Sequence, residues 1–345
     1  MTDADLDTRL LSQLQQAVPL VARPFQALAE QLGCSEATVC RKTDELRGKR
    51  GIIREISGIF DAAALGYRQA LVAMAVDEES LDEAGRVVAG HPGVSHCYSR
   101  RLRSPADLPE YNLWLTLALS PESTLGLEGT AKRLSELASA GRHMVLRSLR
   151  RYKLSVRFDP SSPGRVSKDT STGSPAATEP TDMQRRAIRA LQQDLPAEPE
   201  PFDVLAAGEG LGVDELLSIG RELLNGGQMR RYAAVLRHRS AGARANVMVA
   251  WRAGDAHTAG ARLADCNRVS HCLLRETAPD WPFNLYTMIH GRDEQDCRMT
   301  IDELIATAGL TDRVELWTRD EYAKRRVPLF SDDEAQWEKQ NQVDT

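Results

Sequence analysis

Apolar residues in the first part of the chain recur at the spacing of short helices. Leucines fall on one face of residues 6–14, and a second apolar stripe runs over residues 25–32 until Gly33 ends it. Ser35 then stands in the N-cap position of a third helix. Three short helices with a glycine turn before the third predict a helix-turn-helix, and the alternating residues 51–56 predict the strand of a wing.

The next part of the chain alternates between strand and helix patterns. The order strand, helix, strand, strand, helix, strand is predicted over residues 67–76, 78–90, 94–100, 111–119, 121–139 and 144–158. This βαββαβ order is the ferredoxin-like arrangement. In the fourth of these segments every second residue is leucine, so we expect that face to pack beneath the helices and Trp114 to point the other way. By the same parity His96, Tyr98 and Arg100 share one face of their strand.

Both halves of the chain carry the same motifs, which predicts a tandem duplication. Residues 94–97 read Val-Ser-His-Cys and are followed by Arg100, and residues 269–272 repeat them before Arg275. His271 therefore corresponds to His96, and the Asn-Leu-Trp of residues 112–114 corresponds to Asn-Leu-Tyr at residues 284–286. A repeat of this length must be recognised before a fold is assigned, because each half is then one structural unit.

The predicted fold class is α+β, a winged helix-turn-helix plus a ferredoxin-like unit in two copies. The stretch between the halves is rich in Ser, Thr, Pro and Gly and has few large apolar side chains, which predicts a flexible linker. The predicted domains are a helix-turn-helix at 1–60, a ferredoxin-like domain at 61–158, the linker at 159–181, a degenerate helix-turn-helix at 182–236, a second ferredoxin-like domain at 237–330 and an acidic tail at 331–345.

Composition narrows the class of protein. The 345 residues are 42% hydrophobic and 27% charged, with a net charge of −5, which is typical of a globular protein and unlike a general nucleic-acid binder. No apolar run approaches the roughly 20 residues that span a bilayer, and the acidic N-terminus lacks the features of a signal peptide. The six cysteines form no CxxC pair, so we expect reduced thiols and a cytoplasmic location.

We expect the functional site on the sheet faces that point away from the predicted helices. A sheet face that carries His, Tyr, Trp and Arg is a poor surface for solvent, and its natural partner is the equivalent face of the other half. That face offers His271, Arg275, Asn284 and Tyr286. We therefore expect the two halves to pair with each other and to hold a ligand between their sheets.

These motifs, in this order and spacing, resemble a known family. A helix-turn-helix followed by βαββαβ resembles the Lrp/AsnC family of bacterial transcription regulators over nearly the whole of each half. More specifically, residues 51–76, 91–100, 110–119 and 149–159 resemble siroheme decarboxylases, and the duplication resembles their fused two-subunit form in haem d1 biosynthesis. The resemblance implies removal of CO2 from two acetates of siroheme, giving 12,18-didecarboxysiroheme, without an added organic cofactor. Iron would enter only as part of the substrate.

Siroheme is a flat apolar ring with eight carboxylates, so its site needs apolar walls and cations. The residues expected to bind substrate are Arg100, Arg101, Tyr111, Asn112, Trp114, Arg150, Arg151 and Lys153 in the first half and Arg275, Asn284, Tyr286, Lys324, Arg325 and Arg326 in the second. Loss of CO2 leaves carbanion character that must be protonated, and His96 or Tyr98 is the expected acid. His271 is a catalyst, a candidate ligand of the substrate iron, or a relic of the duplication.

Each of these residues also has a structural interpretation. His96 is equally explained as a hydrogen-bonded strand residue, Trp114 and Tyr286 as core aromatics, and the Arg150 cluster as a solvated strand end. Tyr98 has no tyrosine counterpart, because Leu273 stands in its place. Cys97 and Cys272 lie on the opposite strand face from the histidines, which predicts buried packing. The histidine at position 290 carries no motif, although it shares strand parity with Asn284 and Tyr286.

Two other functions stay open at this point. The first predicted recognition helix has Arg41 and Lys42, followed by Arg47, Lys49 and Arg50, which suits phosphate contacts of a DNA-binding regulator. Its counterpart in the second half has Arg221 as its one basic residue among several acidic ones, so a symmetric operator is a poor target. The third function is a carrier that binds a tetrapyrrole without changing it. Each of these three functions is compatible with further homodimerisation or with association with homologous subunits. A membrane is not expected as a partner, and DNA is disfavoured as one.

Overall fold

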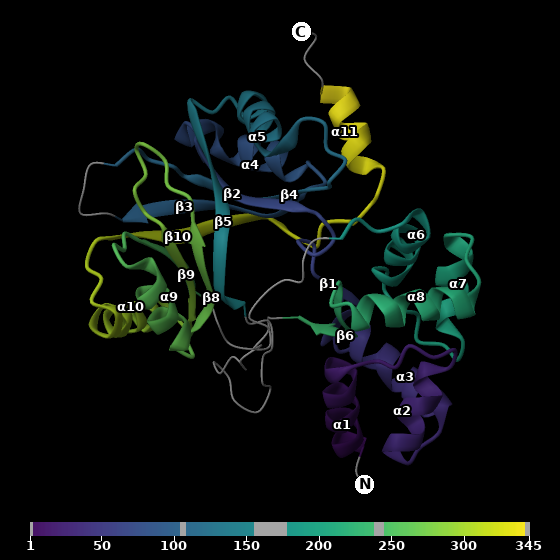
Figure 1. The fold of residues 1–345 in the computed structure, drawn as a ribbon. Coiled ribbons are helices and arrows are strands. Elements are labelled where there is room, and N and C mark those ends of the chain that lie inside the picture. The colour runs from purple at the N-terminus through teal and green to yellow at the C-terminus, as the bar shows by residue number, and fades with distance from the viewer. Residues whose placement is uncertain (1–2, 104–107, 155–177, 238–244, 342–345) are drawn as a thin grey trace. The chain divides into compact units, whose positions relative to one another are not determined.

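The computed structural model describes residues 3–103, 108–154, 178–237 and 245–341, and the chain divides into two compact units (Figure 1). The helix-turn-helix unit consists of residues 1–67, 174–240 and 328–331, and the barrel unit of residues 68–173, 241–327 and 332–345. Each unit therefore contains one part of both halves of the chain. Most of the predicted linker, residues 159–177, lies outside the described residues.

The helix-turn-helix unit contains both copies of the predicted motif. The first copy is α1 (Asp3–Gln16), α2 (Pro24–Leu32), α3 (Glu36–Arg47) and β1 (Ile53–Phe60), and the second is α6 (Asp182–Leu191), α7 (Pro201–Gly208), α8 (Val213–Asn225) and β6 (Met229–Leu236). Gly33 ends α2 at a φ of 69°, which a side chain disfavours, and the Ser35 hydroxyl caps α3 by accepting from the Thr38 amide. The predicted helix end at Gly33 and the predicted cap at Ser35 are confirmed.

The two copies are joined by their wing strands. β1 pairs antiparallel with β6, with Ser57 opposite Ala233, so neither wing strand stands alone. The amide of Ile56 also donates to the Asp194 carboxylate at 2.8 Å. Pairing satisfies the backbone groups that a single exposed strand would leave open.

The basic residues of the first recognition helix are largely used inside the unit. Lys42 is buried, and its Nζ lies 2.7 Å from carboxylates of both Asp3 and Asp7. Arg50 also contacts Asp7, whereas Arg41 pairs with Glu45 and Arg47 with Asp194. Four of the five side chains expected to contact phosphate are therefore paired with carboxylates.

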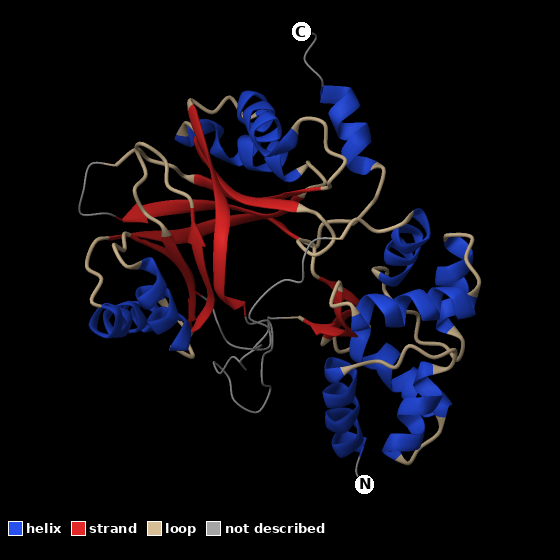
Figure 2. Ribbon diagram, in the orientation of Figure 1, coloured by secondary structure: helices blue, strands red, loops and turns tan. Residues whose placement is uncertain are grey.

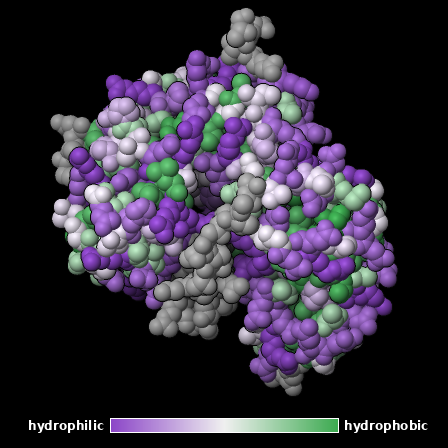
Figure 3. All heavy atoms as spheres, viewed as in Figure 1, coloured by the Kyte–Doolittle hydropathy of each residue, from purple (hydrophilic) through white to green (hydrophobic). Residues whose placement is uncertain are grey.

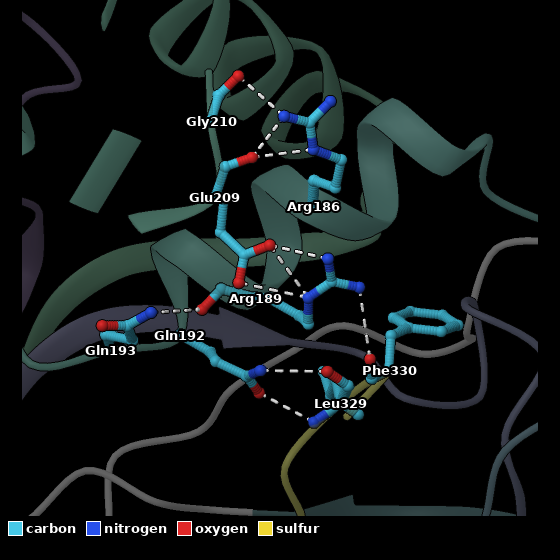
Figure 4. Close-up of polar contacts among 8 residues, drawn as sticks. All are labelled: Arg186, Arg189, Gln192, Gln193, Glu209, Gly210, Leu329 and Phe330. Atoms are coloured by element: carbon cyan, nitrogen blue, oxygen red, sulfur yellow. Dashed lines mark hydrogen bonds and ion pairs between the residues drawn. The ribbon is translucent and has the colours of Figure 1, made fainter. Parts of the chain in front are cut away.

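A short segment late in the chain belongs to the helix-turn-helix unit, not to the second ferredoxin-like domain in which the sequence placed it. Figure 4 shows Leu329 and Phe330 against α6. The Gln192 amide exchanges two hydrogen bonds with the Leu329 backbone at 2.8 and 2.9 Å, and Arg189 joins the Phe330 carbonyl to the Glu209 carboxylate. Sequence periodicity could not detect this contact, because it uses backbone groups of an irregular segment.

The barrel unit contains the two ferredoxin-like copies. The first consists of β2 (Arg68–Ala75), η1 (Glu78–Ser80), α4 (Leu81–Ala89), β3 (Val94–Arg103), β4 (Leu113–Leu119), α5 (Gly126–Leu137) and β5 (Arg142–Leu154). The second consists of β7 (Ala245–Trp251), α9 (Ala256–Asp265), β8 (Val269–Arg275), β9 (Leu285–Gly291), α10 (Glu294–Ala308) and β10 (Arg313–Lys324). The βαββαβ prediction is confirmed for both copies.

The two sheets close into one barrel with the strand order β10-β3-β4-β2-β5-β8-β9-β7. Two edge pairings, β5 with β8 and β10 with β3, join the copies. Figure 2 shows the strands of this unit with the helices on their outer side. Closure removes every open sheet edge and turns the predicted inner faces toward one interior.

Each copy has a core between its sheet and its own helices. Leucines of β4 and Cys97 pack against α4 and α5 in the first copy, and Cys272 packs in the equivalent core of the second. The predicted packing role of both cysteines is confirmed.

The predicted acidic tail contains a helix, α11 (Asp333–Asn341), that belongs to the barrel unit. Glu334 accepts from the Ser120 amide, and Glu338 accepts from the amide of Thr124 at 3.0 Å. The ring of Trp337 packs edge-on against His91, with centroids 4.3 Å apart. The acidic residues of the tail thus satisfy backbone donors before α5.

In the described part of the chain, the helices are all too short or too polar to cross a membrane. The faces visible in Figure 3 are mostly hydrophilic, with apolar residues in scattered patches.

Candidate active site

An aromatic cluster fills part of the barrel interior. It is formed by side chains from both copies that point away from the helices, among them Tyr111, Trp114, Trp281, Phe283 and Tyr286. The indole of Trp281 donates to the Tyr286 hydroxyl at 2.8 Å, and the Trp114 indole donates to the Tyr111 carbonyl. The Tyr286 hydroxyl donates to the Phe283 carbonyl, and the Tyr111 hydroxyl donates to Asp280 at 2.8 Å. These aromatic residues are buried and their polar groups are hydrogen-bonded, so they form a rigid apolar base for the rest of the interior.

β3 directs His96, Tyr98 and Arg100 into the interior, as their parity predicted. Tyr98 lies opposite Trp114 in the sheet, and the alternate residue Cys97 lies in the outer core. The Arg100 guanidinium carbon is 5.0 Å from the centre of the Tyr98 ring, and the His96 and Tyr98 ring centres are 6.2 Å apart. The imidazole Nδ1 of His96 is 3.0 Å from the hydroxyl of Ser95.

β8 repeats this arrangement in the second copy. The His271 Nδ1 is 2.9 Å from the Ser270 hydroxyl, and the Arg275 guanidinium lies 5.7 Å from the centre of the Tyr286 ring. Leu273 occupies the place of Tyr98, so the two copies differ at the centre of the motif.

The two arginines are buried cations without a carboxylate. Arg100 donates to the Leu316 carbonyl at 3.0 Å and the Thr318 hydroxyl at 2.9 Å, and Arg275 donates to the Leu146 carbonyl and the Ser148 hydroxyl at 3.2 and 3.0 Å. Within the described residues neither forms an ion pair, and the Nε of each is buried without a hydrogen-bond partner.

Burial lowers the pKa of each of these guanidinium groups to about 10, which still leaves them charged at neutral pH. A buried positive charge is costly unless an anion compensates it. An anionic group could therefore bind favourably at two equivalent points of the interior, the guanidinium groups of Arg100 and Arg275.

His271 is held neutral. Burial, together with the neighbouring His290, His96 and Arg275, lowers its pKa to about 3. With its Nδ1 engaged by Ser270, its Nε2 is the nitrogen available to a metal or a proton. Three histidines of the interior therefore lie within electrostatic range of one another.

Sequence reasoning attached no role to His290, which β9 places opposite Asn246 on the interior side. The signal that could have found it was its strand parity with Tyr286. No motif drew attention to it.

Several predicted substrate-binding residues lie elsewhere. Arg101 is exposed on the outer side of β3 and pairs with Glu294 at 2.9 Å. Arg150 is exposed and contacts His257, the buried Lys153 donates to the Cys266 carbonyl, and Arg325 donates to backbone carbonyls that include that of His91. The structure does not bring these four to the histidines. Arg101 and Arg150 point to the outer side of their strands, a bulge at residue 152 sends Lys153 outward as well, and Arg325 follows the end of β10.

The predicted asparagines hold backbone instead of pointing to a ligand. Asn112 exchanges two hydrogen bonds with Val76 at 3.0 and 2.7 Å, and Asn284 does the same with Ala253 at 3.0 and 2.9 Å. Their own carbonyls accept from the amides of Arg100 and Arg275. They therefore fix the strand positions from which the arginines project.

Three further predicted cations lie near the later parts of β5 and β10. Arg151 lies opposite Leu273, and Lys324 lies opposite His96, so both strand positions face the interior. Lys324 is 3.8 Å from Glu321, and the half-buried Arg326 follows the end of β10.

The described ranges contain no group of three or more His, Cys, Asp or Glu side chains arranged to hold a metal ion.

Comparison with known proteins agrees with this arrangement. Residues 64–153 and 240–323 match the AsnC-like ligand binding domain, and residues 7–54 and 184–230 match the siroheme decarboxylase NirDL-like HTH domain. The siroheme decarboxylase of Hydrogenobacter thermophilus is 32% identical over 335 residues, which cover 96% of this chain and 97% of that protein. The siroheme decarboxylase NirDL subunit of Paracoccus pantotrophus is 32% identical, over 86% of this chain and 88% of that one.

Solved structures and shorter relatives support the same assignment. The crystal structure of the siroheme decarboxylase NirDL superimposes with a TM-score of 0.77 at 28% identity, over 97% of this chain and 98% of that one. A second structure of NirDL, with the same scores, is a complex with an iron-uroporphyrin III analogue. The beta subunit of the Oleidesulfovibrio alaskensis siroheme decarboxylase is 36% identical and covers 44% of this chain with 97% of its own length, which reflects the duplication. The chain belongs to the siroheme decarboxylase family.

Proposed function

We propose that this protein binds siroheme in the barrel interior and removes CO2 from two of its acetate side chains, giving 12,18-didecarboxysiroheme. The observation that carries the proposal is the pair of buried arginines, Arg100 and Arg275, which face the interior and have no carboxylate partner in the part of the chain that the structure describes. A tetrapyrrole with carboxylates around its rim supplies the missing anions. The family and the iron-uroporphyrin III complex of NirDL support this choice of ligand.

Substrate binding follows from charge and apolar surface. Each arginine contributes roughly 1.5–3 kcal/mol through a charge-assisted contact with a substrate carboxylate. The aromatic cluster of the barrel interior offers an apolar surface to the flat ring of the tetrapyrrole. The neutral His271 is the proposed ligand of the substrate iron, because its Nε2 can donate a lone pair at any pH well above 3.

The reaction needs one proton for each CO2. The bond between the acetate methylene and its carboxyl carbon breaks, and CO2 leaves without the bonding electrons. Those electrons stay on the methylene carbon, which the conjugated ring stabilises, and a proton converts it into a methyl group. The electron balance needs no oxidant and no further organic cofactor.

His96 is the proposed proton donor, and Tyr98 orients the reacting group beside it. Burial raises the pKa of Tyr98 above its ordinary value, and the negative charge of Glu321 acts in the same direction. The phenol therefore keeps its proton and is a weak acid. An imidazole is the side chain best suited to proton transfer near neutral pH.

The helix-turn-helix unit is proposed as a structural and dimerisation element. Its basic residues are largely paired with carboxylates, which leaves few to hold phosphate. All six cysteines are unbridged, which supports the proposed cytoplasmic location.

The test is anaerobic incubation of the purified protein with siroheme, followed by mass spectrometry of the extracted tetrapyrrole. Loss of two carboxyl groups is the expected result. Bound but unaltered siroheme would make the protein a carrier, and no binding at all would reject the proposal.

A further inference from the structure

The barrel has an internal two-fold repeat, and this repeat makes Arg151 and Glu321 equivalent positions. β5 pairs with β8 so that Arg151 lies opposite Leu273 and Lys153 opposite Cys272. β10 pairs with β3 so that Glu321 lies opposite Tyr98 and Ala323 opposite Cys97. Both pairings shift register at the same place, between 151 and 153 and between 321 and 323.

The bulged residues confirm the equivalence. The ring of Tyr152 lies against Gly260 of α9, and the ring of Tyr322 lies against Gly85 of α4, both on the outer side of the barrel. The preceding residues, Arg151 and Glu321, therefore hold the interior side in each copy, because the residues opposite them, Leu273 and Tyr98, pair in turn with residues of the interior cluster.

The two positions carry opposite charges in different surroundings. Glu321 faces the hydroxyl of Tyr98, on the strand that also bears His96 and Arg100, and its side chain is half exposed at the rim. Arg151 lies on the other side, near the strand that bears His271 and Arg275. One side of the interior thus combines a carboxylate and a phenol with the cations Arg100 and Lys324, the latter 3.8 Å from Glu321. The other side combines two guanidinium groups, Arg151 and Arg275, with no carboxylate among the described residues at the position equivalent to Glu321.

A decarboxylation treats these two sides differently. A guanidinium stabilises a carboxylate in the ground state, and that stabilisation is lost when the charge leaves with CO2, so it slows the reaction of the group it holds. A neighbouring carboxylate has the opposite effect, since repulsion is relieved as the acetate loses its charge. Binding energy from carboxylates held elsewhere can offset the repulsion.

We propose that Glu321 and Arg151 set the polarity of the interior, that is, the difference in charge between its two sides; this inference rests on the proposed function. Arg151, with Arg275, anchors carboxylates that do not react. Glu321 is a positioning residue that orients Tyr98 and marks the first-copy side, beside His96, as the place where both acetates lose CO2. The charge difference also selects one of the two orientations that a pseudosymmetric barrel would otherwise offer to the macrocycle.

The experiment separates binding from chemistry. Dissociation constants are measured by absorbance titration with iron-uroporphyrin III, and single-turnover rates of CO2 loss are measured with siroheme at saturation. The variants are Glu321→Gln and Arg151→Gln, with Glu321→Asp and Arg151→Lys as conservative rescues. Arg101→Gln, on the outer face of β3, is the control for surface charge.

The two sites are expected to respond in opposite directions. Glu321→Gln binds the probe as tightly as wild type or more tightly, and its single-turnover rate falls at least tenfold, with recovery in Glu321→Asp. Arg151→Gln weakens binding about tenfold, more than it lowers the saturated rate, with partial recovery in Arg151→Lys. Weaker binding in Glu321→Gln, or an equal loss of rate in both variants, would overturn the proposal.

The binding arm keeps this inference distinct from the proposed function. If the wild type does not decarboxylate siroheme, the proposed function fails, but opposite shifts in affinity would still establish the polarity of the interior. If the wild type is active and the two affinities shift together, the polarity fails while the proposed function stands.

Discussion

Replacing Arg100 with methionine should weaken ligand binding while leaving the protein folded. Arg100 is 3% exposed, and burial lowers its pKa from the ordinary 12.5 to about 10. A depression of this size corresponds to roughly 3 kcal/mol by which burial disfavours the charged form. Because the folded protein binds this proton more weakly than the unfolded chain, the penalty is complete below pH 10 and declines only as pH rises toward 12.5.

Two opposing changes then partly cancel in the free energy of unfolding. Arg100→Met relieves the penalty but removes the hydrogen bonds to the Leu316 carbonyl and the Thr318 hydroxyl, each contributing about 1.5–3 kcal/mol. Thr318 keeps its hydrogen bond to Asn246. The two lost hydrogen bonds together contribute about 3–6 kcal/mol and the relieved penalty is about 3 kcal/mol, so we expect the unfolding free energy of the ligand-free protein to fall by no more than about 3 kcal/mol. The lost contact with a carboxylate should raise the dissociation constant about 10- to 150-fold.

The assay combines urea unfolding of the ligand-free protein with absorbance titration of iron-uroporphyrin III. Arg101→Met, one residue along the same strand but on the outer face, is the matched control and should leave the affinity within about twofold of wild type. An Arg100→Met protein that binds normally would refute the anion-binding role. A loss of stability clearly greater than about 3 kcal/mol would show that Arg100 is there to hold the barrel together.

Three further results are expected. The unfolding free energy should fall as pH drops from 6.5 toward 4, with a slope near pH 5 of about 2.7 kcal/mol per pH unit from two buried histidines. The cause is that His271 (pKa about 3) and His91 (pKa about 4) stay neutral in the folded protein at a pH where they are protonated in the unfolded chain. His91→Gln should halve that slope in urea titrations, and an unchanged slope would contradict the assignment. Gly85→Ala should lower the unfolding free energy by about 1–3 kcal/mol because its Cβ meets the Tyr322 ring, whereas Gly254→Ala meets nothing and should lie within about 0.5 kcal/mol of wild type in the same denaturation series. Selection from a random duplex library should enrich no sequence, since the basic side chains of the first recognition helix are largely paired with carboxylates; a tight, sequence-specific complex would restore the regulator hypothesis.

Much of the fold could be predicted because the local periodicity of apolar residues indicates the helices and strands and the repeated motifs indicate the duplication. The alternating leucines of β4 identify the helix-covered face, and the same parity correctly sends His96 and Arg100 to the interior. The closure of two sheets into one barrel could not be predicted in this way. It depends on backbone pairing between β5 and β8 and between β10 and β3, which leaves no side-chain pattern.

The candidate site was predicted less completely, because residue type alone does not tell which way a side chain points. Arg100 and Arg101 are both expected to bind substrate because both are arginines, yet Arg100 is buried in the interior and Arg101 pairs with Glu294 outside, as strand parity alone requires. Simple alternation would put Arg151 and Lys153 on the same face, but the bulge at residue 152 sends them to opposite faces. The contrast between Arg151 and Glu321 could be found only from the register.

If siroheme loses CO2 inside the barrel with His96 as proton donor, the rate of decarboxylation must depend on this one histidine. Single-turnover decarboxylation of siroheme is measured anaerobically for wild type, His96→Ala and His143→Ala, the last an exposed histidine on the outer side of β5. We expect a rate lower by about 10²–10⁴ in His96→Ala, with bound siroheme retained and with His143→Ala matching wild type. A His96→Ala protein as active as wild type would show that another group donates the proton.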